Sequence, residues 1–216
     1  MDNAQIIRNT AEFIQKEFSN ESTGHDWWHI YRVWKDSVTL AEQEGCDIFL
    51  VEMGALLHDL SDFKFNEEQE GKDKISNWLK GQDLEADYVA KIQEIVEDIS
   101  FKGAGETSRV RSRESAVVQD ADRLDAIGAV GISRAFAYGG KVGRPLYDPD
   151  TKPTEHQSFD DYKKNGNSST INHFYEKLLL LKDRMNTDSA KKVAEDRHRY
   201  MEQFLEEFYK EWEGRA

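Results

Sequence analysis

Cysteine and proline are scarce in this sequence of 216 residues. The one cysteine, Cys46, cannot form an intrachain disulfide, which is typical of proteins in a reducing compartment and predicts a cytoplasmic location. The three prolines, Pro145, Pro149 and Pro153, all lie within nine residues of one another. The rest of the chain therefore lacks the residue that breaks helices most strongly.

Long apolar runs are also missing. The longest strictly aliphatic run covers residues 178–181, whereas a membrane-spanning helix needs about 20 consecutive apolar residues. The first residues, MDNAQIIRNTAEF, lack the basic and then apolar pattern of a signal peptide. We therefore expect a soluble intracellular protein with no membrane partner.

A positive net charge is absent as well. The formal net charge at pH 7 is -13, whereas nucleic-acid-binding proteins are usually basic because they neutralise phosphates. We therefore do not expect a nucleic acid polymer as partner. Basic residues nevertheless outnumber acidic ones between residues 99 and 145, and such a local surplus favours a small anionic ligand over a long polyanion. A solvated surface with ordinary ion pairs is an equally good interpretation of the charge. These basic residues are Lys102, Arg109, Arg111, Arg113, Arg123, Arg134, Lys141 and Arg144.

Helical periodicity is what the sequence does contain. Apolar residues recur at intervals of three and four in successive segments, and no convincing strand-like alternation is present. We predict an all-α fold in a single domain, 1–216. Within it, the polar residues of chemical interest fall in 25–128, a long irregular segment in 139–169 and further helices in 170–213.

The long helix predicted from Thr187 to Trp212 is rich in aromatic residues. Its periodicity places Val193, Tyr200, Phe204, Leu205 and Phe208 on the inward face. The aromatic side chains at its end suit the core of one chain and a homodimer contact with a second copy equally well; they are Phe204, Phe208, Tyr209 and Trp212.

Histidine and aspartate occur at the ends of predicted apolar helices. His58 is followed at once by Asp59 in GALLHDLSDF, and a buried carboxylate needs a partner or a metal. The later segment VVQDADRLDAIGA adds three aspartates among apolar residues. Imidazole and carboxylate together suit a divalent transition metal. His29, His58, Asp59 and one later aspartate would supply four ligands and leave positions for water and substrate.

The segment HDWWH permits a rival interpretation. It resembles the HExxH motif of zinc proteases with Asp26 in place of the glutamate, and it would put His25 and His29 on one metal. Aspartate is one methylene shorter than the catalytic glutamate, and this interpretation leaves the pair at 58 and 59 unexplained. His25 could also cap its helix or pack against Trp27 and Trp28.

The ordered set of one histidine, a His-Asp pair and a final aspartate resembles the HD-domain phosphohydrolase superfamily. His29 matches its first histidine, His58 and Asp59 match the pair that names it, and Asp122 in DADRLDA matches its last aspartate. The segments HDWWH, HDLSDFKF, SFKG and DADRLDAIGA resemble a bacterial subgroup similar to manganese-dependent nucleoside-triphosphate pyrophosphohydrolases. The resemblance implies a helical HD-type bundle with a C-terminal helical extension.

The resemblance also implies one divalent transition metal, with Mn favoured over Co, Ni, Fe, Mg or Zn. Binuclear members add histidines between the His-Asp pair and the last aspartate, and this sequence has no histidine from residue 60 to residue 155. We therefore expect a mononuclear site. Asp125, three residues after Asp122, could replace it or orient Arg123 or a ligand histidine, whereas Asp120 is expected to be exposed.

Further polar residues are candidates for the reaction itself. Asp62, three residues beyond Asp59, could orient or deprotonate the attacking water, or it could be a solvent-exposed carboxylate. Phosphoryl transfer depends mainly on positioning and charge stabilisation. We therefore predict substrate contacts, with structural ion pairs as the alternative for the cationic residues, from His25, Arg32, Lys64, Lys102 and Arg123.

These observations predict a metal-dependent phosphohydrolase that acts on small nucleotides. We expect it to hydrolyse (deoxy)nucleoside triphosphates to monophosphate and pyrophosphate through a metal-activated water. A 5′-nucleotidase acting on monophosphates is the close alternative. The helical pattern is also compatible with a module that senses nucleotides without turnover and with a purely structural helical protein.

Overall fold

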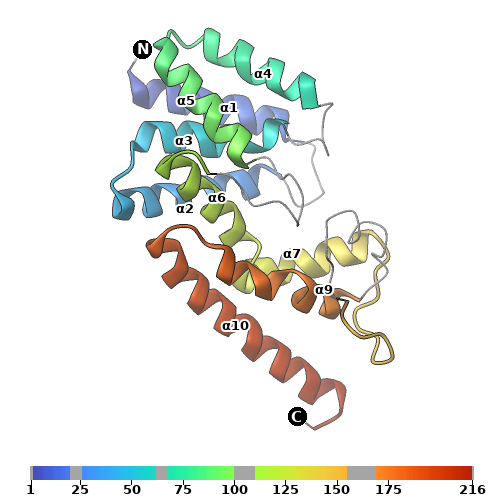
Figure 1. The fold of residues 1–216 in the computed structure, drawn as a ribbon. Coiled ribbons are helices and arrows are strands. Elements are labelled where there is room, and N and C mark those ends of the chain that lie inside the picture. The colour runs from blue at the N-terminus through green and yellow to red at the C-terminus, as the bar shows by residue number, and fades with distance from the viewer. Residues whose placement is uncertain (1, 20–25, 62–67, 100–109, 155–168, 216) are drawn as a thin grey trace. The chain divides into compact units, whose positions relative to one another are not determined.

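The computed structural model describes residues 2–19, 26–61, 68–99, 110–154 and 169–215, and all regular structure in these ranges is helical (Figure 1). The predicted all-α fold class is therefore confirmed. The helices are α1 (Asn3–Glu17), α2 (Trp27–Glu44), α3 (Ile48–Leu57), η1 (His58–Ser61), α4 (Glu68–Lys80), α5 (Ala86–Ile99), α6 (Arg113–Asp125), α7 (Gly128–Lys141), α9 (Thr170–Glu176), η2 (Leu178–Arg184) and α10 (Asp188–Trp212).

The chain forms two compact units, which we describe separately. The first unit takes in α1 to α5 and α6 as far as Asp122, and the second unit runs from Arg123 through α10. In the first unit α3 contacts α1, α2 and α5 (Figure 1). Nearly every residue of α3 is buried, as expected of a helix that is apolar all round.

Side-chain caps set where helices α2 and α3 of the first unit begin. The Asp26 carboxylate accepts a hydrogen bond from the backbone N–H of His29 at 3.0 Å, and the Asp47 carboxylate accepts one from Leu50 at 3.2 Å. Gly45 ends α2 in the left-handed conformation with φ 68°, which glycine adopts at no steric cost. These caps place His29 in the first turn of α2 and let α3 start soon after α2 ends.

Aromatic contacts dominate the second unit. Phe204 of α10 lies 5.9 Å from both Phe136 of α7 and Phe174 of α9, measured between ring centroids. Tyr147 contacts Phe208, Tyr209 and Trp212 near the end of α10. Four aromatic residues of the long helix therefore make ring contacts within one copy of the chain, namely Phe204, Phe208, Tyr209 and Trp212.

The inward face of α10 differs from the predicted one at Tyr200. Its side chain is 52% exposed, so the prediction that it faces inward was wrong. The buried line of this helix runs through Ala194, Met201 and Leu205, which are spaced seven and four residues apart. The end of α7 also includes Gly139 and Gly140, which the sequence assigns to the irregular segment 139–169.

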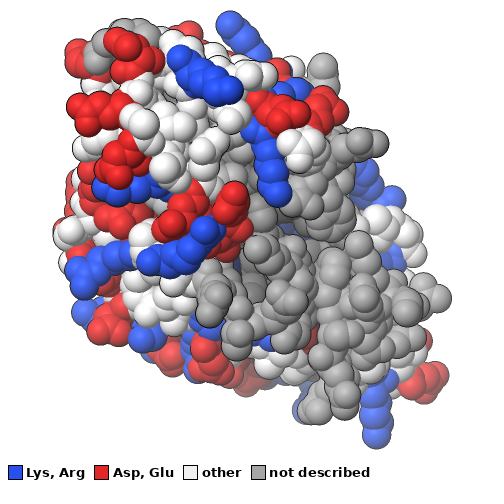
Figure 2. Space-filling model, turned by 45° about the horizontal axis from the view of Figure 1, so that its top comes forward, with Lys and Arg blue, Asp and Glu red and all other residues white. Residues whose placement is uncertain are grey.

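No helix in the described ranges is both long and apolar enough to cross a membrane. On the molecular face drawn in Figure 2, acidic and basic side chains are interspersed.

Candidate metal centre

Three residues with metal-binding side chains converge in the first unit. His29 lies in the first turn of α2, His58 follows the last residue of α3, and Asp59 lies in η1. All three are buried, with exposed fractions of 0%, 3% and 5%. One donor atom from each lies within 4.8 Å of the others. This spacing would let all three side chains bind one ion.

The Asp59 carboxylate lies between the two imidazoles. Its Oδ2 is 3.3 Å from Nε2 of His29, and its Oδ1 is 3.3 Å from Nε2 of His58. Asp122, on α6, adds a further carboxylate, because its Oδ1 is 3.4 Å from Nε2 of His29. The Asp122 side chain is 37% exposed, so this side of the group meets solvent.

The protonation of His58 indicates that the group suits a cation. Its Nδ1 lies 2.7 Å from the backbone oxygen of Ala55, and because a carbonyl can only accept, Nδ1 carries the hydrogen. In the neutral ring Nε2 then presents a lone pair toward the Asp59 carboxylate, and this buried nitrogen has no hydrogen-bond partner in the described part of the chain. Two acceptors facing each other are stabilised by a cation between them, so these residues fit a bound divalent metal.

The three aspartates of α6 have different environments. Asp122 lies beside His29, while Asp125 forms an ion pair with Arg134 inside the second unit. Asp120 is fully buried, so the prediction that it is exposed was wrong. It lies three residues after Val117 and beside Ala121, both fully buried, and the helical period therefore places it on the inward face.

Several predicted site residues lie outside the described residues, namely His25, Asp62, Lys64 and Lys102. Of the remaining predicted substrate contacts, Arg32 lies one turn after His29 on α2 and is partly buried. The guanidinium of Arg123 donates to the backbone oxygen of Arg184 within the second unit.

Asp26 has a structural role that the sequence did not reveal. Its carboxylate caps α2 by accepting from the backbone of His29, whereas the HExxH-like interpretation needs an acidic side chain that acts on a metal-bound water. His29 itself faces Asp59 and Asp122. This geometry therefore favours the set of His29, His58 and Asp59 over the HExxH-like interpretation.

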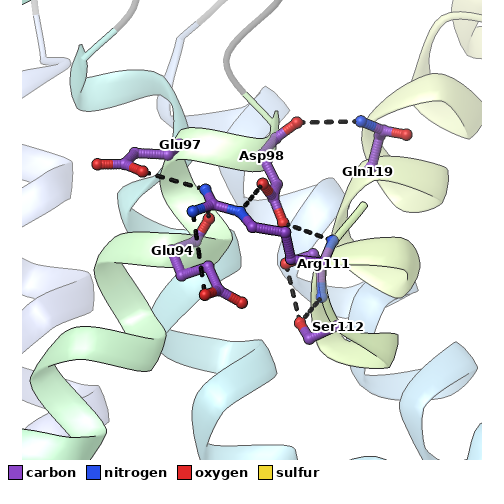
Figure 3. A network of polar contacts seen from close by, with 7 residues as sticks. Glu94, Glu97, Asp98, Arg111, Ser112 and Gln119 are labelled. Atoms are coloured by element: carbon purple, nitrogen blue, oxygen red, sulfur yellow. Dashed lines mark hydrogen bonds and ion pairs between the residues drawn. The ribbon is translucent and has the colours of Figure 1, made fainter. Parts of the chain in front are cut away.

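Arg111 joins the end of α5 to the start of α6, as Figure 3 shows. Its Nε donates to Asp98 Oδ1 at 2.6 Å, and its backbone N–H donates to Asp98 Oδ2 at 3.0 Å. The guanidinium also donates to the Glu97 carboxylate at 3.0 Å and to the Glu94 carbonyl at 3.3 Å. This arginine of the basic segment therefore acts as a structural contact.

Comparison with known proteins gives the family context for this group. Residues 27–127 match the HD domain family. The chain is 38% identical to Bacillus subtilis YpgQ over 204 residues, which cover 94% of this chain and 91% of YpgQ. The chain belongs to the HD-domain family. As a member it is an HD-type metal-dependent phosphohydrolase, which confirms the enzyme class predicted from the sequence.

Solved structures similar to this chain match it over nearly its whole length. An HD-superfamily hydrolase from Bacillus thuringiensis superimposes with a TM-score of 0.80 at 44% identity, covering 98% of this chain and 99% of the other. Bacillus subtilis YpgQ, crystallised in complex with ADP, superimposes with a TM-score of 0.77 at 36% identity, covering 97% of this chain and 100% of YpgQ.

Proposed function

We propose that this HD-domain hydrolase cleaves nucleoside triphosphates, including deoxynucleotides, into a nucleoside monophosphate and pyrophosphate. The observation that carries the proposal is the convergence of buried His29, His58 and Asp59 with the carboxylate of Asp122 beside them. Such a mixed set of imidazole and carboxylate ligands would hold one divalent ion, for which Mn is favoured over Co, Ni, Fe, Mg or Zn.

A bound ion supplies a water of lowered pKa and charge stabilisation for a phosphate oxygen. The residues of the chain must then position the substrate, because phosphoryl transfer depends mostly on positioning and electrostatics. Arg32 is our candidate for the phosphate contact nearest to His29, and His25, Lys64, Lys102 and Arg123 are further candidates. Asp62 is our candidate for the group that orients the attacking water and takes its proton.

Two facts support a nucleotide as substrate. The related YpgQ has been crystallised with ADP, and the flanking motifs resemble pyrophosphohydrolases that act on nucleoside triphosphates. In the proposed reaction, water oxygen bonds to the α-phosphorus while the bond from that phosphorus to the bridging oxygen breaks. Pyrophosphate leaves with the electron pair, and the water proton passes to a base.

The decisive experiment is a product assay on the full chain after chelation and separate reloading with Mn, Co, Ni, Mg or Zn. The substrates are nucleoside mono-, di- and triphosphates, and the variants are His58→Ala and Asp122→Ala. His198→Ala is the control, because His198 lies in α10 and pairs with Glu202. We expect pyrophosphate from triphosphates, lost in both site variants and retained in the control.

Different outcomes would change the proposal in defined ways. Inorganic phosphate released from monophosphates would establish a 5′-nucleotidase instead. Nucleotide binding without turnover in any metal would indicate a sensing module. Pyrophosphate release that survives in His58→Ala would remove the proposed metal centre from the reaction.

A further inference from the structure

Trp28 is a large aromatic residue with much of its surface exposed to solvent. Its side chain is 59% exposed, the largest exposed fraction among the large apolar residues that the structure describes. It lies in the first turn of α2, directly before His29. Burying a large aromatic ring away from water is favourable, so an exposed tryptophan next in sequence to a candidate metal ligand suits a ligand that covers it.

Neighbouring aromatic residues hold the Trp28 indole from one side. Tyr31 packs edge-on against it, with ring centroids 5.8 Å apart and an interplanar angle of 79°. Tyr31 also contacts Trp27 at 6.0 Å and Trp34 at 6.2 Å. The Trp34 indole N–H donates to the Glu52 carboxylate of α3 at 3.0 Å. This aromatic cluster therefore supports the indole while much of its surface stays exposed.

The position of Trp28 on α2 relates it to the metal centre. Arg32 follows Trp28 by four residues and His29 by three, and residues at these spacings are neighbours on a helix surface, with Cβ atoms about 5–6 Å apart. Arg32 is thus a neighbour on α2 of both the buried imidazole of His29 and the exposed ring of Trp28. A nucleotide likewise presents phosphates at one end and a flat aromatic base at the other.

We propose that Trp28 is a specificity-determining residue that stacks on the base of the bound nucleotide. The proposal rests on the proposed function, because it assigns the base end of the same substrate. Stacking on an aromatic side chain depends little on which base is bound, since every base has a π-face. Trp28 would therefore select nucleotides as a class over polyphosphates that carry no base.

The activity test compares ATP and dATP with inorganic tripolyphosphate in the Mn-loaded full chain. The variants are Trp28→Ala, Trp28→Phe and the control Trp212→Ala, whose tryptophan is 49% exposed in the second unit. In Trp28→Ala we expect KM for both nucleotides to rise about tenfold, in keeping with base–aromatic stacking elsewhere. Trp28→Phe and Trp212→Ala should stay within about twofold of wild type, and tripolyphosphate kinetics should be the same in all variants.

A binding test keeps the proposal separable from the reaction. Indole fluorescence is followed while ADP or pyrophosphate is added with Mn, and the difference between wild type and Trp28→Phe isolates the signal of one of the five tryptophans. ADP should quench this signal and pyrophosphate should not. If no nucleotide is hydrolysed in any metal, the proposed function fails, and the quenching still decides whether Trp28 stacks on a base.

Two results would overturn the stacking role. One is an unchanged KM for ATP in Trp28→Ala together with no ADP-dependent quenching of Trp28. The second is an equal loss of activity toward ATP and tripolyphosphate in Trp28→Ala. That result would mean that Trp28 supports the metal centre and does not contact the base.

Discussion

A single hydrogen bond decides which nitrogen of His58 can bind a metal. The contact of Nδ1 with the Ala55 carbonyl at 2.7 Å orients the ring and leaves Nε2 directed at Asp59. The acceptor belongs to α3 itself, three residues before His58, so the local helix fixes the ring orientation. An imidazole held in this way loses little side-chain freedom when it binds an ion.

The thiol of Cys46 should be a poor nucleophile at neutral pH. Its pKa is raised from 9.0 to about 11, first by burial and then by the Glu114 carboxylate, with a smaller opposing effect from Arg113. Only the thiolate reacts, so a pKa raised by two units lowers the rate of alkylation at pH 8 by about 100-fold. Iodoacetamide labelling of native and urea-unfolded protein, followed by mass spectrometry, measures this ratio.

The pH dependence of labelling provides the control for Cys46. The rate for the folded protein should keep rising as the pH increases above 9, whereas the rate for the unfolded protein should level off. Equal rates for the folded and unfolded protein at pH 8 would contradict the shifted pKa.

At the scale of elements, the close approach of α3 and α5 depends on one glycine. A Cβ added at Gly54 would lie 2.5 Å from Cγ2 of Ile95, which is closer than real contacts allow. Gly54→Ala should therefore destabilise the protein by about 1–3 kcal/mol, because a packed core accommodates extra volume only with strain. Urea unfolding followed by circular dichroism measures this loss.

A second variant separates this clash from the change in helix propensity. Ile95→Ala removes Cγ2, so Gly54→Ala should cost less when introduced into Ile95→Ala than into wild type. The same cost in both backgrounds would show that the contact with Ile95 is not the cause.

The Arg111 contacts should stabilise the junction of α5 and α6. Asp98 is only 4% exposed, so Arg111→Ala would leave a buried carboxylate with fewer partners. We expect Arg111→Ala to lower the free energy of unfolding by about 1–2 kcal/mol. This is less than the loss of a fully buried ion pair would cost, because the Arg111 side chain is 43% exposed and solvent screens its charge. Arg111→Lys should recover only part of it, because lysine cannot donate from a planar fork.

Arg199 offers a matched control for Arg111. It pairs with Asp196 at 3.4 Å on the exposed face of α10, and exposed pairs of this kind contribute about 0.5 kcal/mol or less. Equal destabilisation by Arg111→Ala and Arg199→Ala would contradict the structural role of the Arg111 contacts.

The elements differ in how well the sequence predicts them. Periodicity alone indicates the helices, and the ordered spacing of His29, His58, Asp59 and Asp122 singles out residues that the fold brings together. The role of Arg111 could not be predicted, because it lies before the start of α6 and its partners Glu94, Glu97 and Asp98 lie on α5. The helical period of the sequence already places Asp120 on the inward face of its helix. The prediction that it is exposed gave more weight to its charge.

At the scale of the whole molecule, the candidate metal centre belongs to the first unit and the aromatic packing of α10 described above to the second. The single-domain interpretation of 1–216 remains a prediction. The division falls within α6, between Asp122 and Arg123, so one continuous helix carries a candidate metal ligand and the start of the second unit.

The second unit should make the stability of the molecule depend on pH. The pKa of His173 is lowered from 6.5 to about 3, first by burial and then by the nearby cations Lys177 and Arg144. Below pH 6.5 the unfolded chain binds a proton at this residue that the folded chain does not. The contribution of His173 to the free energy of unfolding is therefore greatest above pH 6.5 and falls with decreasing pH down to about 3.

The expected slope from His173 is about 1 kcal/mol per pH unit between pH 6.0 and 5.0, somewhat below the limit for one proton because the unfolded imidazole is only partly protonated near pH 6. Urea unfolding at pH 7.5, 6.0 and 5.0 with a chelator present measures it, and His173→Gln should show a shallower pH dependence than wild type. The difference between the two proteins isolates His173 from the remaining histidines, since these titrate in both. Parallel pH profiles would mean that His173 is protonated equally in the folded and unfolded chain.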